Sequence, residues 1–374
     1  MSGGASNTTG RLRLRASLPA WFDGKGPEGD VVISTRVRLA RNLAGHKFPA
    51  RASAREKQKI FKEAEAAILN LSKQFGRLEI INFVKLKKLE QYFLVEERMA
   101  SADMLKGEGD RGVACDVLGK FCVMINEEDH LRIQKMASGY HTFELWEAAS
   151  RADDDIGRGL KYAYSERLGF LTACPTNSGT GLRVSYLMHL PGLVLTKSIE
   201  QVLQGASQMG IATRGFFGEC SDVVGNFFQL SNQATMGASE TEFIESTSKV
   251  IKEVIDHERK ARERLAEGAL LEVIDKVSRA CGILCSARVL SFTELLSLTS
   301  ALRLGIDCGI YNGHTVSELN KMVMLAMPAH LQAYISGSED RYPDPDVARA
   351  DAIREFFGKK KAVVKKKAAR KPRA

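Results

Sequence analysis

The chain has 374 residues, 44% of them hydrophobic and 26% charged, with a formal net charge of +9. This length is enough for a buried core and predicts two domains. No stretch approaches the ~20 apolar residues of a membrane span, no signal-peptide core precedes the fold, and seven irregularly spaced cysteines exclude a disulfide framework, so we expect a cytoplasmic protein.

The excess positive charge is confined to the C-terminus. Residues 359–374 contain nine Lys/Arg and no acid, so the other 45 basic residues balance 45 acidic ones. We predict a disordered leader over 1–17 and a disordered Lys/Ala-rich tail over 358–374. Such a tail can contact nucleic-acid phosphates weakly and non-specifically, or it can act only as a solubilising segment.

The first part of the chain mixes strand and helix patterns. Val31–Ile33 predicts a buried strand, and if it continues, alternation places Arg36 and Arg38 on one side of it. Apolar spacing of three and four predicts an amphipathic helix over 53–75. Short strands are expected at three later places: Tyr92–Val95, Gly112–Cys115 and Phe121–Ile125.

An acidic run, N-E-E-D-H-L-R at Asn126–Arg132, follows the last of these strands. Three successive carboxylates stand there beside a histidine and an arginine. Asn126 is a good helix N-cap, and acids in a first turn suit the helix dipole. From the run alone, a capped helix start and a catalytic site are equally open.

Beyond this run, helices are expected over 143–149, 156–164, 182–190 and 193–209. Phe227–Asn232 alternates like a strand, and Ser239–Glu242 is a capping box that opens a long helix ending near Arg264. Residues 270–357 are predicted to be mostly helical, with breaks at Gly282, 309–313 and Pro328. The irregular interleaving favours an antiparallel or mixed sheet flanked by helices.

Three further motifs concentrate charge outside the predicted helix interiors. C-P-T-N-S-G-T-G-L-R at Cys174–Arg183 places a thiol and a glycine turn before the predicted helix at 182–190, whose N–H groups could face an anion. R-G-F-F-G-E at Arg214–Glu219 and S-T-R-V-R at Ser34–Arg38 add arginines and a carboxylate. Such a set can hold a polyanion and a cation side by side, and neither a Rossmann nor a Walker motif is present.

The four motifs together resemble those of the guanido kinases (ATP:guanido phosphotransferases), most closely the bacterial protein arginine kinases. They occur in the family's order, and the similarity runs from about residue 21 to 264 and more weakly to 357. The resemblance implies an α+β fold: a catalytic domain over 18–265 with an antiparallel sheet flanked by helices, followed by a smaller all-helical domain over 266–357.

The resemblance also implies roles for individual residues. Glu128 and Glu219 would clamp the planar guanidinium, aim one nitrogen at the γ-phosphorus and take its proton, with the choice of base left open. Cys174 matches the family's reactive cysteine, although a small buried apolar residue is the alternative. The implied ATP-binding positions are Ser34, Thr35, Arg36, Val37, Arg38, Arg132, Arg183, Val184, Ser185, Arg214 and Gly215. Mg²⁺ would be carried by ATP, and we expect no dedicated metal site in the protein.

The implied substrates are proteins that bear exposed arginine. Kinases of small guanidino compounds carry a helical domain before the S-x-R-V-R strand, whereas 33 residues precede Ser34 here. Relatives further imply an activating adaptor, a protease chaperone, self-association as a homo-oligomer, and a task in stress response or in marking proteins for degradation. Two alternatives stay open: a kinase of free arginine or another small guanidino compound, and a non-catalytic adaptor that acts through the basic tail.

Two positions depart from the bacterial branch. Its R-D-x-x-R-A motif, a regulatory phosphoarginine pocket, aligns here with a run that begins at Pro345 and reads P-D-V-A-R-A. A proline supplies no guanidinium, so the sequence leaves open whether that pocket survives. Arg98 stands where the branch has a histidine on the adenine side.

Overall fold

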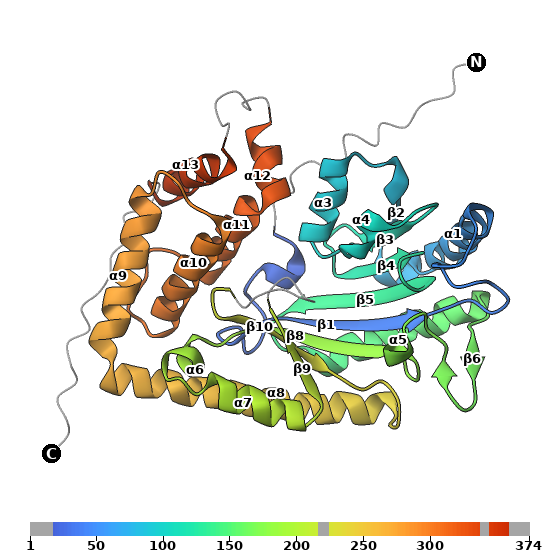
Figure 1. Ribbon diagram of the computed structural model, residues 1–374, viewed down its shortest axis with the longest axis horizontal. Coiled ribbons are helices and arrows are strands. Elements are labelled where there is room, and N and C mark those ends of the chain that lie inside the picture. The colour runs from blue at the N-terminus through green and yellow to red at the C-terminus, as the bar shows by residue number, and fades with distance from the viewer. Residues whose placement is uncertain (1–17, 216–223, 337–343, 359–374) are drawn as a thin grey trace.

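A single antiparallel sheet of eight strands runs through the middle of the molecule (Figure 1). The computed structural model describes residues 18–215, 224–336 and 344–358. The strand order is β2-β3-β4-β5-β1-β8-β10-β9. The strands are β1 (Val32–Arg41), β2 (Leu78–Asn82), β3 (Gly112–Asp116), β4 (Phe121–Ile125), β5 (Leu131–Ser138), β8 (Leu182–His189), β9 (Ile211–Arg214) and β10 (Phe227–Asn232). A separate small hairpin is formed by β6 (Tyr164–Ser165) and β7 (Gly169–Phe170).

The two faces of the sheet differ because side chains alternate along each strand. On the central strand β1, Val37 is fully buried in the main core, whereas Arg36 and Arg38 lie on the opposite face. The neighbouring strand β8 repeats the pattern, with Val184 in the core and Arg183 on the same face as the β1 arginines. The sheet therefore has one apolar face and one face that presents arginines.

Helices cover the apolar face: α1 (Ala54–Leu69), α5 (Thr142–Gly159), α7 (Ile199–Gln208) and α8 (Glu240–Gly268). The predicted capping box at Ser239 is present, because its hydroxyl accepts the backbone N–H of Glu242. The same arrangement at Ser53 starts α1, which ends before the short α2 (Ser72–Phe75). The shorter helical segments are Ala20–Phe22, Phe83–Lys85, α3 (Lys88–Glu96), α4 (Asp103–Lys106), Pro175–Asn177 and α6 (Pro191–Leu195).

The C-terminal part is helical and has a second hydrophobic core, beside the end of the sheet (Figure 1). Its helices are α9 (Leu270–Ser286), α10 (Phe292–Asp307), α11 (Val316–Ala326), α12 (Pro328–Ile335) and α13 (Pro345–Gly358). Arg262 of α8 ties the two parts together, since it pairs with Glu258 at 2.6 Å and with Asp307 of α10 at 3.0 Å. Among the described helices, none is long and apolar enough to cross a membrane.

The α+β class, the antiparallel sheet flanked by helices and the helical C-terminal region are confirmed. Two predicted breaks, at 309–313 and Pro328, separate helices, but Gly282 lies inside α9. The helices expected over 143–149 and 156–164 are one helix, α5, which ends at Gly159, and the one expected over 193–209 is split into α6 and α7. The leader and residues 359–374 of the predicted tail lie outside the described residues, whereas Gly358, its first residue, ends α13.

Three other predictions are wrong. Asn126 does not cap a helix: it has φ 55° in the turn of the β4–β5 hairpin, where its amide donates to backbone carbonyls of Lys57 and Asp110. Tyr92 and its neighbours form part of α3 and not a strand. Leu182–His189 is the strand β8, whose near-complete burial hides the period-2 signal that separates a central strand from a buried helix.

Candidate active site

A cavity of about 750 Å³ opens on the arginine face of the sheet. Strand alternation explains its composition, because four strands each turn arginines toward the same side. The predicted site residues that line it are Arg36 and Arg38 of β1, Arg132 of β5, Arg183 of β8, Arg214 of β9, Glu128 and Cys174. Segments distant in the sequence are thus brought to one hollow, with Arg38 directly across from Arg183 in the β1–β8 register.

The other predicted positions do not line this cavity: Ser34, Thr35, Val37, Val184, Ser185 and Gly215. The two valines belong to the opposite, apolar face of the sheet. The hydroxyl of Thr35 is buried and donates to the Gly139 carbonyl at 2.7 Å, so it holds the backbone. Ser185 is one step removed from the cavity, where its hydroxyl accepts from Nε of Arg36 at 3.2 Å. Glu219 lies outside the described residues.

The cavity concentrates positive charge. Burial, with repulsion from Arg38 and Arg98, holds the pKa of Arg36 well below its usual range. Burial, followed by repulsion from neighbouring arginines, lowers the pKa of Arg38 to about 9. No carboxylate of the described residues forms an ion pair with either of these two side chains. A bound polyanion would therefore offset the mutual repulsion of these arginines.

The acidic turn between β4 and β5 gives its first two glutamates different environments. The side chain of Glu127 is buried, and it accepts from the Ser101 hydroxyl at 2.5 Å and pairs with Arg132 at 2.8 Å. Glu128 also pairs with Arg132, but 41% of its side chain is exposed. Burial, only partly offset by Arg132, raises the pKa of Glu128, which makes its carboxylate a better proton acceptor. Of these two acids, Glu128 is the one available to a substrate.

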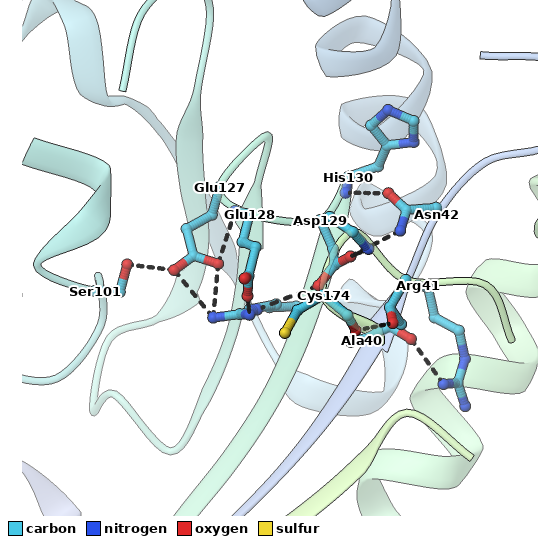
Figure 2. Close-up of polar contacts among 12 residues, drawn as sticks. Ala40, Arg41, Asn42, Ser101, Glu127, Glu128, Asp129, His130 and Cys174 are labelled. Atoms are coloured by element: carbon cyan, nitrogen blue, oxygen red, sulfur yellow. Dashed lines mark hydrogen bonds and ion pairs between the residues drawn. The ribbon is translucent and has the colours of Figure 1, made fainter. Parts of the chain in front are cut away.

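The third acid, Asp129, connects the acidic turn to the loop of Cys174. One oxygen of the fully buried Asp129 carboxylate accepts from the Asn42 side chain at 2.7 Å and from the Ala173 backbone N–H at 2.8 Å. In Figure 2 the Cys174 sulfur and the Glu128 carboxylate point into the same space, consistent with both lining the cavity. The thiol lies 3.0 Å from the Thr176 hydroxyl.

The helix N-terminus expected after the Cys174 loop does not exist, because β8 follows it. The loop instead depends on glycine: Gly181 has φ 66°, and a Cβ there would lie 2.6 Å from the Ala40 carbonyl oxygen of β1. The tight approach holds the loop against β1 beside the cavity.

His130 links the acidic turn to the backbone of residues 43–47. Its Nδ1 accepts the backbone N–H of Leu43 at 3.0 Å, and its Nε2 lies 3.0 Å from the Lys47 carbonyl, which leaves no ring nitrogen for the substrate. Burial lowers the pKa of His130 to about 4. His130 is therefore a neutral scaffold histidine.

This depressed pKa predicts a loss of stability in acid. An unfolded histidine takes up a proton near pH 6.5, whereas folded His130 stays neutral down to about pH 4, so stability should fall as the pH drops through that window. The amide of His130→Gln can keep both hydrogen bonds but does not titrate. The loss of unfolding free energy between pH 7.5 and pH 4.5 should therefore be smaller in this variant by roughly 2–3 kcal/mol. Urea unfolding between pH 7.5 and pH 4.5 measures it, and equal slopes for the two proteins would contradict the assignment. Burial also lowers the pKa of His189, so the stability of both proteins should still depend on pH to some extent.

Several cavity residues carry no signal in the local sequence. Phe292, Met327 and Pro328 come from the helical region and line the same hollow. Arg98, noted for its departure from a family pattern, also lines it, with its guanidinium carbon 4.9 Å from the Trp21 ring centroid. Burial lowers the pKa of Arg98 to about 10. Long-range contacts, which residue patterns do not encode, bring these side chains to the site.

The motif around Pro345 is occupied by structural contacts. Arg349 is 4% exposed and donates to the carbonyls of Ala326 at 3.0 Å and Leu290 at 2.9 Å. It also pairs with Asp346, three residues earlier on the same helix. Arg349 therefore fastens α13 to its neighbouring helices.

Comparison with known proteins matches both parts of the chain. A family model described as "ATP:guanido phosphotransferase, C-terminal catalytic domain" matches residues 59–261, and one described as "Protein-arginine kinase McsB C-terminal domain" matches residues 271–368. The protein-arginine kinase of Desulforamulus reducens is 39% identical over 337 residues, 90% of this chain and 94% of that protein. That of Bacillus subtilis is 39% identical over 346 residues, 91% of this chain and 94% of that protein.

A solved structure is similar to the chain at greater distance. The substrate-free duplicated taurocyamine kinase from Schistosoma mansoni aligns with a TM-score of 0.57 and 25% identity, covering 72% of this chain and 39% of that chain. The two family models leave a gap at residues 262–270, where α8 gives way to α9.

Proposed function

This chain belongs to the ATP:guanido phosphotransferase family as a protein-arginine kinase, and from that premise we propose how its own residues carry out the transfer. The γ-phosphorus leaves the bridging oxygen of the β-phosphate and bonds to a guanidino nitrogen of a substrate arginine. One guanidinium proton passes to a carboxylate, and ADP and phosphoarginine are released. The observation that carries the proposal is the cavity that the predicted arginines share with Glu128 and Cys174.

The arginines would bind the triphosphate. Guanidinium forks meet phosphate oxygens with paired N–H donors, so arginines on adjacent strands can contact successive phosphates and stabilise charge that spreads in transfer. Because the strands belong to one sheet, these donors are held in place before the nucleotide arrives. Magnesium would be bound to the phosphate oxygens of ATP and would neutralise part of their charge. Among the described residues, no three His, Cys, Asp or Glu side chains are grouped to hold a metal.

Glu128 would hold the substrate guanidinium. Its half-exposed carboxylate, beside Cys174, can accept two N–H groups of the planar cation and fix one nitrogen toward the γ-phosphorus. Its raised pKa suits it to accept the released proton. Glu219 is proposed as the second carboxylate of this clamp, and the choice of base between the two stays open.

The test is the product itself. The purified chain, MgATP and an arginine-rich protein such as histone should yield acid-labile phosphoarginine, identified on peptides by mass spectrometry. Phosphorylation of free arginine in place of histone would favour the small-guanidino alternative. The absence of both products would favour an adaptor that acts without catalysis.

The proposal extends to the partners that relatives imply. We propose an activating adaptor, a protease chaperone that receives the phosphorylated proteins, and self-association as a homo-oligomer. The first two partners would place the kinase in stress response or in the marking of proteins for degradation. The basic segment at 359–374 lies outside the described residues and is proposed only as a weak, salt-sensitive contact for nucleic acid.

A further inference from the structure

One wall of the cavity belongs to the helical region and not to the sheet. Phe292 begins α10, and Met327 and Pro328 stand where α11 gives way to α12, yet all three line the cavity together with the β1 arginines. They fall within residues 271–368, the range matched separately by the C-terminal family model. The cavity is therefore incomplete without the helical region.

A single acid holds this wall in position. Glu96, the last residue of α3, accepts the backbone N–H groups of Ala329 at 2.7 Å and His330 at 3.1 Å, which are the first free donors of α12. Its carboxylate also lies 2.6 Å from Nδ1 of His330, and the Phe93 ring stacks on that imidazole at 4.0 Å between centroids. Both partners are largely buried, with 15% and 6% of their side chains exposed. Glu96 itself lines the cavity, so the joint and the wall are contiguous.

The β1–β5 register orders the cavity from end to end. Arg132, which pairs with Glu128, marks one end of the cavity. From there Arg38 and then Arg36 follow along β1, and Arg36 lies opposite Met136 of β5. Four residues of strand, roughly 13 Å, separate Arg132 from Met136. Met136 is in one hydrophobic cluster with Met327, and Phe292 packs against that cluster. A triphosphate bound by the arginines with its γ-phosphate at Glu128 would thus direct its nucleoside toward the helical region.

We propose that the helical C-terminal region forms the base-binding end of the nucleotide cavity, with Phe292, Met327 and Pro328 as its contact surface and the Glu96–His330 pair as the device that positions it. A ring, a thioether and a proline face are the groups on which a flat heteroaromatic base packs well. The triphosphate is bound by the sheet and the base by the helices. This inference rests on the proposed function, because it takes the cavity to be the ATP site.

The test separates the two ends of the nucleotide. Calorimetry on the full-length chain with Mg²⁺ measures the Kd of ATP and of inorganic tripolyphosphate, which lacks a base. In the wild type, ATP should bind about tenfold more tightly, the size expected for a base packed on an apolar wall. Glu96→Gln and His330→Asn should each raise the Kd of ATP toward that of tripolyphosphate, which itself should stay within about twofold.

Further variants keep the test decisive. Met327→Ala removes contact surface from the wall itself and should also raise the Kd of ATP toward that of tripolyphosphate. It provides the test if Glu96→Gln or His330→Asn folds poorly. Tyr334→Phe removes the hydrogen bond that the exposed Tyr334 hydroxyl donates to Glu355, and it should change neither affinity. Equal weakening of both ligands, or an unchanged Kd for ATP, overturns the inference. If the wild type binds neither ligand, the assignment of the cavity to ATP fails, and this inference fails with it.

Discussion

Glu128→Gln should lower the rate of phosphoarginine formation by about 100-fold or more. The amide has the shape of the carboxylate and can still accept a hydrogen bond from Arg132, so the turn should keep its conformation. It can neither hold a guanidinium by charge nor take up its proton. Single-turnover transfer from ATP to histone, followed by mass spectrometry of phosphoarginine, measures the loss.

The matched control is another acid on the same cavity. Asp103 lines it with 73% of its side chain exposed, and Asp103→Asn should leave turnover within about twofold. A Glu128→Gln protein that binds ATP normally and keeps more than a tenth of wild-type turnover would remove Glu128 from the clamp. Thermal unfolding of each variant confirms that its fold is intact.

Arg38→Met should reduce kcat/KM for ATP by about 100- to 1000-fold while stabilising the unliganded protein. The folded-state pKa of Arg38, about 9, lies below that of an exposed arginine, so its charge is disfavoured in the fold relative to the unfolded chain. Since this side chain is half-buried, we expect a gain of roughly 1–2 kcal/mol. Urea unfolding with and without MgATP measures both effects, because stabilisation by the nucleotide should also disappear.

An arginine three residues along the same strand gives the opposite expectation. Arg41 is 1% exposed, forms a bidentate pair with Asp153 and stacks on Phe170 with its guanidinium carbon 3.6 Å from the ring centroid. Arg41→Met leaves a buried carboxylate without its cation and should cost about 3–5 kcal/mol. If Arg38→Met destabilised the protein as much as Arg41→Met, repulsion among the cavity arginines would not be destabilising the fold.

Patterns of a few residues predicted much of this molecule, because they depend on local physics. The alternation on β1 that separates Arg36 and Arg38 from Val37, and the capping box at Ser239, each follow from backbone geometry. The motif resemblance marked the arginines and Glu128, which the fold brings to one cavity.

Failures arose where tertiary contacts decide the outcome. Asn126 satisfies the rules for a helix cap, but pairing of the apolar runs on both sides of it makes a hairpin turn. β8 is buried on both faces, so its sequence has no visible period. Phe292 and Met327 reach the cavity through the packing of the helical region, and nothing in their neighbours indicates that.

The position of β1 at the centre of the sheet has a consequence for biosynthesis. Arg36 pairs with Met136 on one side and with Ser185 on the other, partners 100 and 149 residues further along the chain. At 5–20 residues per second, a ribosome needs roughly 5–20 s to supply the first partner and longer for the second. During that interval the nascent strand exposes its apolar residues and unpaired peptide groups, which makes the incomplete chain prone to aggregation until both neighbouring strands have been synthesised.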